Sequence, residues 1–349
     1  MREEAISGAL LAWYDVSARV LPWRVPPLTD LRADPYRVWL SEIMLQQTTV
    51  AAVKSYFERF TDLWPTVADL AAARDADVMG EWAGLGYYAR ARNLLKCARV
   101  VVADFGGRFP QTEAELLTLP GVGPYTAAAV ASIAFNQPAP VMDGNIERVM
   151  ARLFAVEEAL PRCKPVLKAH AARLTPSARP GDHAQALMDL GATICTPKSP
   201  ICGICPLMNA CAARKAGIAA DLPRKAPKKL KPVRNGYVYL ARRADGAILL
   251  ETRPDKGLLG GMLGFPTSDW SDSPVEDPPF EADWHDPGLE VRHTFTHFHL
   301  RLAIRMSEAR LDMVPHRGEF HLGAQFKPSS LPTLMRKAHE LSKNALGHD

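Results

Sequence analysis

The sequence has no run of the roughly 18 to 20 apolar residues that a membrane-spanning helix needs. Its first twenty residues, MREEAISGALLAWYDVSARV, also lack the basic start, the long apolar segment and the small-residue cleavage site of a secretory signal. Cysteine is scarce, with only six residues in the chain. We therefore expect a soluble cytoplasmic protein, associated with the nucleoid if it is bacterial, without a membrane partner and without a disulfide framework.

Neither sign of charge dominates the composition. Lys and Arg number 42 against 38 Asp and Glu, which leaves a formal net charge of +4 and a pI near 8.7. This balance permits a nucleic-acid partner without requiring one. The hydrophobic share of 47% and the length of 349 residues are enough for two globular domains, each with its own core.

The pattern of the chain changes near residue 222. Residues 1–221 are helical almost throughout, whereas 222–235 form a basic, proline-rich linker that either spaces two domains or lies along a phosphate backbone. Residues 236–349 carry the two-residue period of strands. We expect helices at 65–80, 87–105, 112–119, 124–135, 145–156, 163–174 and 182–194, strands at 235–243, 247–253 and 294–306, and a last helix at 331–346.

An acidic residue interrupts an apolar helix early in the chain. Asp34 and Pro35 form a good helix start, and the helix continues into VWLSEIMLQQTTV at 38–50, which places Glu42 at the border of the apolar stripe. The simpler interpretation is that Glu42 leans out into water. A buried carboxyl would instead have a raised pKa, and an acid that stays protonated near neutral pH is able to donate a proton.

A turn with two glycines separates two expected helices within LTLPGVGPYTAAAVASIAF, residues 117–135. The second helix begins with Pro124 at its first position. Gly121, Val122 and Gly123 let the backbone approach a ligand, and outward N–H groups of such a turn suit a phosphate. A plain corner between helices is the alternative. The order helix, LPGVG, helix nevertheless resembles the helix-hairpin-helix element, which grips the DNA backbone without reading its sequence.

Asp143 precedes another helix, in PVMDGNIERVMARLF. A turn or capping role is sufficient to explain this position. Together with a protonated Glu42, an ionised Asp143 also fits a second role, in which one acid protonates a leaving group while one carboxylate stabilises the positive sugar left behind. Only the fold can bring these two distant residues together.

Four cysteines have the spacing of a metal site, with gaps of six, two and five residues between them: Cys195, Cys202, Cys205 and Cys211. Four thiolates hold either a [4Fe-4S] cluster or a zinc ion. Zinc sites more often show two short cysteine pairs, and only one is present here, so we favour the iron-sulfur cluster. The two remaining cysteines, Cys97 and Cys163, are expected in the core.

Together these features resemble the helix-hairpin-helix DNA glycosylases that carry an iron-sulfur cluster, specifically the adenine DNA glycosylases of the MutY family. The resemblance runs from about residue 8 to about residue 305. It implies a multidomain protein: an all-α helix-hairpin-helix glycosylase domain at 1–221 with a [4Fe-4S] cluster held by the loop 195–211, the linker 222–235, and an α+β Nudix-like domain at 236–349. The motifs that carry it are LPWR (21–24), DPYRVWLSEIMLQQTTV (34–50), GLGYYARARNL (84–94), LPGVGPYTA (119–127), VMDGNIERV (141–149), the cysteine pattern and FTH (295–297).

The resemblance assigns roles to residues of the first domain. Glu42 matches the catalytic acid that protonates adenine at a ring nitrogen, and Asp143 matches the carboxylate that stabilises the oxocarbenium-like sugar. Tyr125 matches a tyrosine that supports this site. Arg24 and Gln185 match positions that contact the extruded adenine.

Further residues match positions that contact DNA. Gln47, Leu85 and Tyr87 correspond to residues that wedge into the base stack, and we include Thr48 in the DNA-binding set together with the glycine turn. The expected substrate is double-stranded DNA in which adenine faces 8-oxoguanine or guanine, bound by a monomer.

In the second domain, Phe295, Thr296 and His297 match the loop that senses 8-oxoguanine, with Thr296 where many relatives have serine. In a regularly alternating strand, His297 is equally explained as an ordinary outward residue. The segment GLLGGMLGFP at 257–266 fits the Nudix-like pattern, but the glutamate-rich box of Nudix pyrophosphatases is absent, so we expect no pyrophosphatase activity.

Two rival functions remain. A pyrimidine glycosylase with lyase activity needs a lysine where Tyr125 stands, because an amine must attack the sugar. A non-catalytic iron-sulfur regulator would use the helix hairpin and the cluster but would need neither Glu42 nor Asp143 as acids. The segment 25–33, VPPLTDLRA, looks longer than the connection usual in the family, and the sequence assigns it no role.

Overall fold

The structure is a computed structural model that describes residues 3–227, 230–254, 257–322, 326, 328 and 331–345. Contacts between residues divide the chain into two compact units, Met1–Pro227 and Lys228–Asp349, each with its own hydrophobic core. The division falls inside the stretch 222–235 that we proposed as a linker. Within the described ranges, no helix combines the length and the apolar character needed to cross a membrane.

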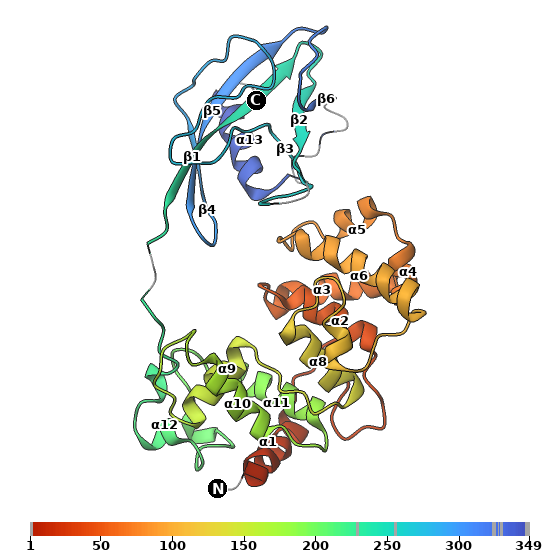
Figure 1. Ribbon diagram of the computed structural model, residues 1–349, viewed down its shortest axis with the longest axis vertical. Helices are drawn as coiled ribbons and strands as arrows, with labels where there is room; N and C mark the ends of the chain where they lie inside the picture. The colour runs from red at the N-terminus through yellow and green to blue at the C-terminus, as the bar shows by residue number, and fades with distance from the viewer. Residues whose placement is uncertain are drawn as a thin grey trace. The chain divides into compact units, whose positions relative to one another are not determined.

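In the described residues of the first unit, the regular elements are helices, with one isolated β-bridge between Leu160 and Lys225 (Figure 1). One group of helices runs from α2 to α8, and α1 with α9 to α12 forms a second group; they meet where α8 packs against α11. The helices are α1 (Glu3–Ser17), α2 (Pro35–Leu45), α3 (Val50–Leu63), α4 (Val67–Ala72), α5 (Asp75–Glu81), α6 (Ala89–Phe105), α7 (Glu113–Leu116), α8 (Pro124–Phe135), α9 (Gly144–Leu153), α10 (Lys164–Leu174), α11 (Pro180–Thr193) and α12 (Ala212–Lys215), with short 3-10 helices at η1 (Cys202–Ile204) and η2 (Ala219–Asp221).

Local sequence signals position the helices that build the site. The Asp34 side chain accepts a hydrogen bond from the Tyr36 N–H and caps α2, and Pro35 opens the helix as predicted. Gly181 lets α11 approach α8 closely, because a Cβ at this position would lie 2.6 Å from the carbonyl oxygen of Ser132. The contact between α8 and α11 therefore depends on a residue without a side chain.

Two predicted helices are wrong in extent. The helix expected at 65–80 is two helices, α4 and α5, because α4 ends after Ala72 and a new helix begins at Asp75. The helix expected at 112–119 is the single turn α7, which ends at Leu116. Pro120 disfavours a helical conformation for the residue before it, so the chain turns there instead.

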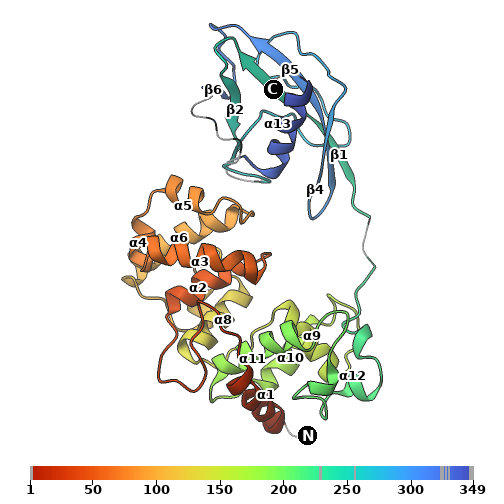
Figure 2. The same ribbon diagram turned by 180° about the vertical axis from the view of Figure 1, so that it is seen from behind.

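The second unit is a mixed sheet with one helix against it, seen from opposite sides in Figures 1 and 2. The strand order is β3-β2-β1-β5-β4, with β6 paired to β2; β1 and β5 run parallel over their full length. The elements are β1 (Val233–Arg243), β2 (Ile248–Thr252), β3 (Leu263–Gly264), β4 (Glu290–Thr294), β5 (His299–Ala309), β6 (Glu319–His321) and α13 (Thr333–Ala345). The prediction of an all-α domain followed by an α+β domain is confirmed.

The single strand expected at 294–306 is wrong. The chain forms an antiparallel hairpin there, in which Thr294 at the end of β4 pairs with His299 at the start of β5. The hydrogen bond from the Phe295 N–H to the Phe298 carbonyl, 2.9 Å long, closes the tip. The apolar positions are odd-numbered up to Phe295 and even-numbered from Phe298, so the two-residue period changes phase at the turn.

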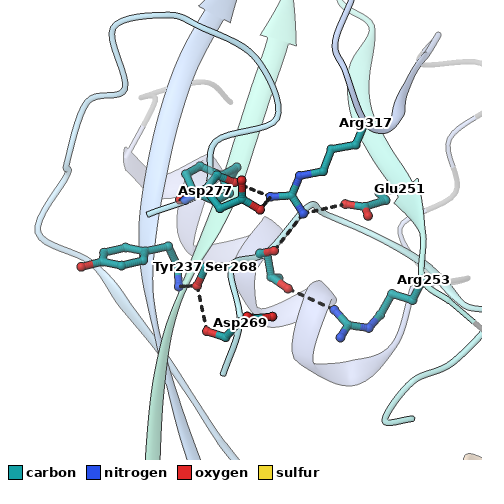
Figure 3. Close-up of polar contacts among 9 residues, drawn as sticks. Tyr237, Glu251, Arg253, Ser268, Asp269, Asp277 and Arg317 are labelled. Carbon is teal, nitrogen blue, oxygen red and sulfur yellow. Dashed lines mark hydrogen bonds and ion pairs between the residues drawn. The ribbon is translucent and has the colours of Figure 1, made fainter. Parts of the chain in front are cut away.

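Arg317 anchors the loop that follows β3 to the sheet (Figure 3). Its Nη1 donates to the Thr267 carbonyl at 3.1 Å and lies 3.5 Å from a carboxylate oxygen of Glu251, while Nη2 lies 3.1 Å from Asp277. Arg253, at the end of β2, donates to the Thr267 hydroxyl at 3.0 Å. Two cations and two carboxylates thus stabilise this side of the second unit.

Candidate active site

A cavity of about 470 Å³ lies in the first unit, within the range of roughly 300–1,000 Å³ typical of small-molecule pockets. Its walls come from the segment before α2, from α2 and the loop after it, and from the starts of α8 and α9 together with α11. Most of the residues predicted for chemistry or base contact line it: Arg24, Glu42, Gln47, Thr48, Tyr125, Asp143 and Gln185. The fold therefore brings together residues that the sequence separates by up to 161 positions.

Glu42 is buried, with only 5% of its surface exposed. Burial raises the pKa of Glu42 to about 7, although a hydrogen bond from Tyr125 and the charge of Arg24 act in the opposite direction. The interpretation of Glu42 as a residue leaning out into water is thus wrong. A carboxyl with this pKa is partly protonated at neutral pH and is suited to donate a proton.

Tyr125 is the second residue of α8 and follows the glycine turn closely. Its hydroxyl donates a 2.6 Å hydrogen bond to Oε2 of Glu42. Burial, and then the nearby charges of Glu42 and Asp143, raise the pKa of Tyr125 well above its ordinary value, so the phenol stays protonated. The turn expected to contact DNA therefore leads within two residues to a side chain that contacts the candidate acid.

Asp143 caps α9 and also lines the cavity, so its two interpretations are compatible. Its Oδ1 accepts from the Ile146 N–H at 2.7 Å and its Oδ2 from the Asn145 amide at 2.8 Å. Burial raises the pKa of Asp143, and these two hydrogen bonds together with the charge of Arg148 oppose the rise. The Glu42 carboxyl accepts one hydrogen bond, whereas the Asp143 carboxyl accepts several. The anion is therefore favoured more strongly at Asp143, so one pocket offers both a protonated acid and a carboxylate.

Two arginines share one buried carboxylate in the pocket wall. Asp189 is fully buried, and both of its oxygens lie 2.7 Å from Nη1 of Arg24, while Arg19 donates through its backbone N–H at 2.9 Å and through Nε at 2.6 Å. The Gln185 side chain lines the same cavity. An arginine fork and an amide therefore face the space that a base would fill.

Sequence reasoning missed Asp189 and Arg19. The signal for Asp189 was available, because an aspartate inside the apolar run HAQALMDLGATI resembles the anomaly that drew attention to Glu42. Arg19 has no comparable signal, since arginines are common in exposed connections.

The residues expected to wedge into DNA differ in exposure. Gln47 and Tyr87 are exposed and hold positive φ values of 58° and 49°, which are unusual for residues with a side chain. Thr48 is partly buried beside Gln47. Leu85, by contrast, is only 6% exposed. Its expected insertion into the stack requires the loop to move from the conformation seen here.

The glycine turn uses one of its N–H groups internally. Gly121 has a φ of +75°, and a Cβ there would lie 2.7 Å from the Cβ of Asn93, so this position requires glycine. The Val122 N–H donates to the Leu119 carbonyl at 3.2 Å, and Val122 itself is buried. Our expectation that all N–H groups of the turn point outward is therefore wrong for Val122; Gly121 and Gly123 remain candidates.

The four cysteines of the loop 195–211 border one small cavity next to α9. Burial, and to a smaller extent the charges of the other three cysteines, raise the pKa of the Cys205 thiol to about 11, while a backbone hydrogen bond at Leu207 opposes the rise. Four cysteine sulfurs around one small cavity fit a four-iron cluster.

A buried cation lies beside these sulfurs. Arg152 is 2% exposed; its Nη1 lies 3.3 Å from Sγ of Cys195 and donates to the Thr196 carbonyl at 2.8 Å, while Nε donates to the Leu222 carbonyl at 2.9 Å. A positive charge here offsets the negative charge of thiolate ligands. The donor set and its surroundings thus suit a [4Fe-4S] cluster.

In the second unit, the predicted loop residues occupy the tip of the β4–β5 hairpin. Thr296 and His297 are exposed. Phe295 is partly buried and stacks on Trp270 with 5.6 Å between ring centroids, so it anchors the tip to the domain. Two of the three residues are therefore free to contact a ligand.

Models of three protein families match the chain. The model described as HhH-GPD superfamily base excision DNA repair protein matches residues 40–173. The iron-sulfur binding domain of endonuclease III matches 195–211, and the NUDIX domain matches 237–341.

Individual proteins are also similar. The adenine DNA glycosylase of Homo sapiens is 36% identical over 95% of this chain and 73% of its own length, and that of Mycolicibacterium smegmatis is 42% identical over 60% and 70%. The solved structure of a thermostable thymine-DNA glycosylase has a TM-score of 0.55 and 31% identity, covering 61% of this chain and 97% of its own. A non-covalent endonuclease III–DNA complex, 24% identical with a TM-score of 0.50 over 62% of this chain and 99% of its own, supports the fold alone.

Proposed function

The chain belongs to the adenine DNA glycosylase family, and from this premise we propose that it hydrolyses the N-glycosidic bond of adenine that faces 8-oxoguanine or guanine in duplex DNA. It is a base-excision DNA repair glycosylase that acts on DNA and carries a [4Fe-4S] cluster. The product of the proposed reaction is DNA with an abasic site. We propose that it acts as a monomer.

The proposal rests mainly on one observation: Glu42 is a buried acid whose pKa lies near neutral pH. Burial raises the pKa of Glu42 to about 7, so the carboxyl can hold its proton near neutral pH. Asp143 lines the same cavity and accepts two hydrogen bonds that favour its anion. The pocket therefore offers a proton donor and a carboxylate to one bound base and its sugar.

The reaction then follows from these two groups. Extruding adenine from the duplex costs a few kcal/mol and is cheapest at a mispair. Glu42 transfers its proton to a ring nitrogen of adenine, the electron pair of the C1′–N9 bond leaves with the base, and Asp143 stabilises the positive sugar. Water adds to C1′, and the proton that it loses returns to Glu42.

Tyr125 supports hydrolysis without strand cleavage. A lyase needs an amine that attacks C1′ to form a Schiff base, and a phenol whose pKa is raised by burial does not form one. We infer a monofunctional glycosylase. The cluster supplies structure rather than chemistry here, because hydrolysis of this bond transfers no electron.

The second unit supports selection of the lesion. Thr296 and His297 present a hydroxyl and an imidazole at an exposed hairpin tip, and both are groups able to form hydrogen bonds with a base edge. We propose that this tip contacts 8-oxoguanine.

The test is single-turnover release of adenine from a duplex with one adenine opposite 8-oxoguanine, beside a duplex that contains thymine glycol. We expect free adenine, with strand breaks only after alkali. Breaks before alkali at thymine glycol would instead favour the pyrimidine lyase.

Glu42→Gln separates the enzyme from a DNA-binding regulator. Gln keeps the size of the side chain and can accept the hydrogen bond from Tyr125, but it has no acidic proton. We expect loss of at least about a hundredfold in the rate, which is the scale of general acid catalysis, with DNA binding retained. A wild-type protein that binds DNA, carries its cluster and releases no base from either duplex would refute the enzymatic proposal.

A further inference from the structure

Two separate loops present exposed residues with strained backbones, and one of these loops lines the pocket. Gln47 lies in the loop after α2 with a φ of 58°, and Tyr87 lies in the loop before α6 with a φ of 49°. Left-handed conformations of such residues persist only where the surroundings enforce them. Something beneath these loops must therefore hold both of them.

Arg90, in the first turn of α6, joins the two loops. Its Nη1 donates to the carbonyls of Ile43 at 3.0 Å and Met44 at 2.8 Å, which belong to the last turn of α2. Its Nη2 donates to the Thr48 hydroxyl at 3.0 Å and to the Leu85 carbonyl at 3.1 Å. One guanidinium thus bonds the end of α2, the residue after Gln47 and the loop that carries Tyr87.

Aromatic contacts extend the same connection. The Arg90 guanidinium carbon lies 5.5 Å from the ring centroid of Tyr87 and 5.2 Å from that of Trp82. The Trp82 Nε1 in turn donates to the Gly86 carbonyl at 3.1 Å, and Nη2 of Arg90 donates to the same oxygen at 3.3 Å. Arg90 therefore contacts both the backbone of the loop that carries Tyr87 and the Tyr87 ring itself.

Arg90 is 8% exposed, and in the described parts of the chain no carboxylate pairs with it. Burial lowers the pKa of Arg90 to about 10, which leaves the side chain cationic at neutral pH. The carbonyls of Ile43 and Met44 compensate this charge, because the last turn of a helix has unpaired carbonyls and the negative end of its dipole. Lysine cannot replace this arrangement, since only the planar fork reaches several acceptors in fixed directions.

We propose that Arg90 is a positioning residue that holds the Gln47 loop and the Tyr87 loop as one unit, so that both engage the duplex together and keep the target base extruded. This inference rests on the proposed function, since it assigns the two loops a task in base extrusion. In this proposal Arg90 does not contact the base; it fixes the positions of Gln47 and Tyr87, which contact the DNA.

The test compares two duplexes in single-turnover adenine release with saturating Arg90→Lys enzyme. In one duplex the target adenine faces guanine, and in the other it faces a tetrahydrofuran abasic analogue, where no pair has to be broken. We expect Arg90→Lys to slow release from the guanine duplex by at least about tenfold, the scale of lost hydrogen bonds to a charged group, and from the abasic duplex by less than about threefold. General damage to the fold would slow both equally, and that result would overturn the inference.

The matched control is Arg99→Lys on the same helix. Arg99 also donates to two carbonyls, those of Ala71 and Ala73, but it connects α4 to α6 away from both loops. It should leave the ratio between the two duplexes unchanged. If Arg90→Lys does not fold, Thr48→Val removes one acceptor of Arg90 at constant size and should shift the ratio in the same direction; an unchanged ratio would refute the proposal.

Fluorescence separates extrusion from chemistry. In the Glu42→Gln background, 2-aminopurine at the target position brightens when it leaves the stack, and we expect a weaker signal when Arg90→Lys is added. An equal signal would refute the role of Arg90. If the wild-type protein releases no adenine at all, the proposed function is wrong, and this comparison still decides the role of Arg90 because extrusion requires no catalysis.

Discussion

The Tyr125 hydroxyl donates a 2.6 Å hydrogen bond to Oε2 of Glu42, across 83 positions of sequence. This contact joins the first turn of α8 to the middle of α2 and fixes the acid inside the pocket. It also lowers the pKa of Glu42, against the larger effect of burial. The contact therefore affects both the geometry and the acidity of the same group.

Tyr125→Phe should move the basic limb of the pH–rate profile to higher pH. Without the hydrogen bond that favours its anion, Glu42 keeps its proton to a higher pH, and the reaction needs the protonated form. Near pH 6 we expect a loss of less than about tenfold, because one hydrogen bond is removed. The measurement is single-turnover adenine release between pH 5 and 9. Tyr36→Phe, which removes a hydroxyl bonded to the Trp64 carbonyl outside the pocket, should leave the limb in place.

Glu42→Gln should stabilise the protein in alkaline solution. The pKa of Glu42 is about 7 in the folded protein and 4.5 ordinarily, so the folded state binds the proton more tightly and stability falls as the pH rises from 4.5 to 7. Above pH 7 the buried anion costs roughly 3 kcal/mol, which follows from about 1.4 kcal/mol for each pKa unit. Gln removes this cost.

We therefore expect the thermal midpoint of Glu42→Gln to exceed that of the wild type by several degrees at pH 8 and to approach it at pH 5. Scans at one heating rate compare the two proteins. An equal difference at both pH values would mean that Glu42 is not the buried acid described above.

The sequence predicted site residues where a residue type was unusual for its local sequence context. Glu42 in an apolar helix, two glycines between helices and four closely spaced cysteines each violate a local expectation, and such violations mark functional sites. Asp189 violates the same expectation, inside the helix expected at 182–194, and sequence reasoning did not single it out. Its two arginine partners lie about 165 positions away, and no local pattern predicts them.

The conformations of the loops could not be predicted from the sequence, for a different reason. The burial of Leu85 and the internal hydrogen bond of Val122 depend on how loops settle on neighbouring helices, and local propensity does not decide that. The hairpin at 295–298 shifts the phase of the alternation between Phe295 and Phe298, and the single strand expected at 294–306 did not take this shift into account.

Asp189→Asn should destabilise the first unit by about 3–5 kcal/mol, the usual effect of removing one partner of a buried ion pair. Asp189 is fully buried and Arg24 nearly so, and the neutral amide leaves the charge of Arg24 uncompensated. Denaturant unfolding at pH 7 measures the change. Asp77→Asn breaks an exposed pair with Arg74 and should leave stability unchanged within error; equal effects of the two substitutions would contradict the role assigned to burial.

Arg152→Gln should lower the retention of iron. The substitution removes the cation 3.3 Å from Sγ of Cys195 and weakens the bonds that hold the carbonyls of Thr196 and Pro197. We expect a lower iron content per protein after purification and faster bleaching of the cluster absorption by a chelator. Arg214→Gln serves as the control, because this arginine lines the same cavity but is bonded only weakly, at 3.5 Å, to the Met208 carbonyl. Equal iron content in the two variants would contradict the role of Arg152.

The hairpin tip of the second unit gives the last prediction. Thr296 and His297 are exposed, whereas the Phe295 ring stacks on Trp270 and packs at a tilt against Phe298, which fixes the tip. Removing the two exposed side chains should therefore alter what the tip contacts without altering its fold. We expect Thr296→Ala with His297→Ala to reduce the preference for adenine opposite 8-oxoguanine over adenine opposite guanine by about tenfold, the worth of one or two lost hydrogen bonds.

Single-turnover rates on the two duplexes give this preference as a ratio. Because the pocket lies entirely in the first unit, the rate of adenine release opposite guanine should change little. The ratio should therefore fall only because the rate opposite 8-oxoguanine falls. Asp272→Ala alters an exposed loop of the same unit and should leave the ratio intact. If the double substitution lowers both rates in parallel, the tip contributes to DNA binding in general, and the lesion must be recognised elsewhere on the protein.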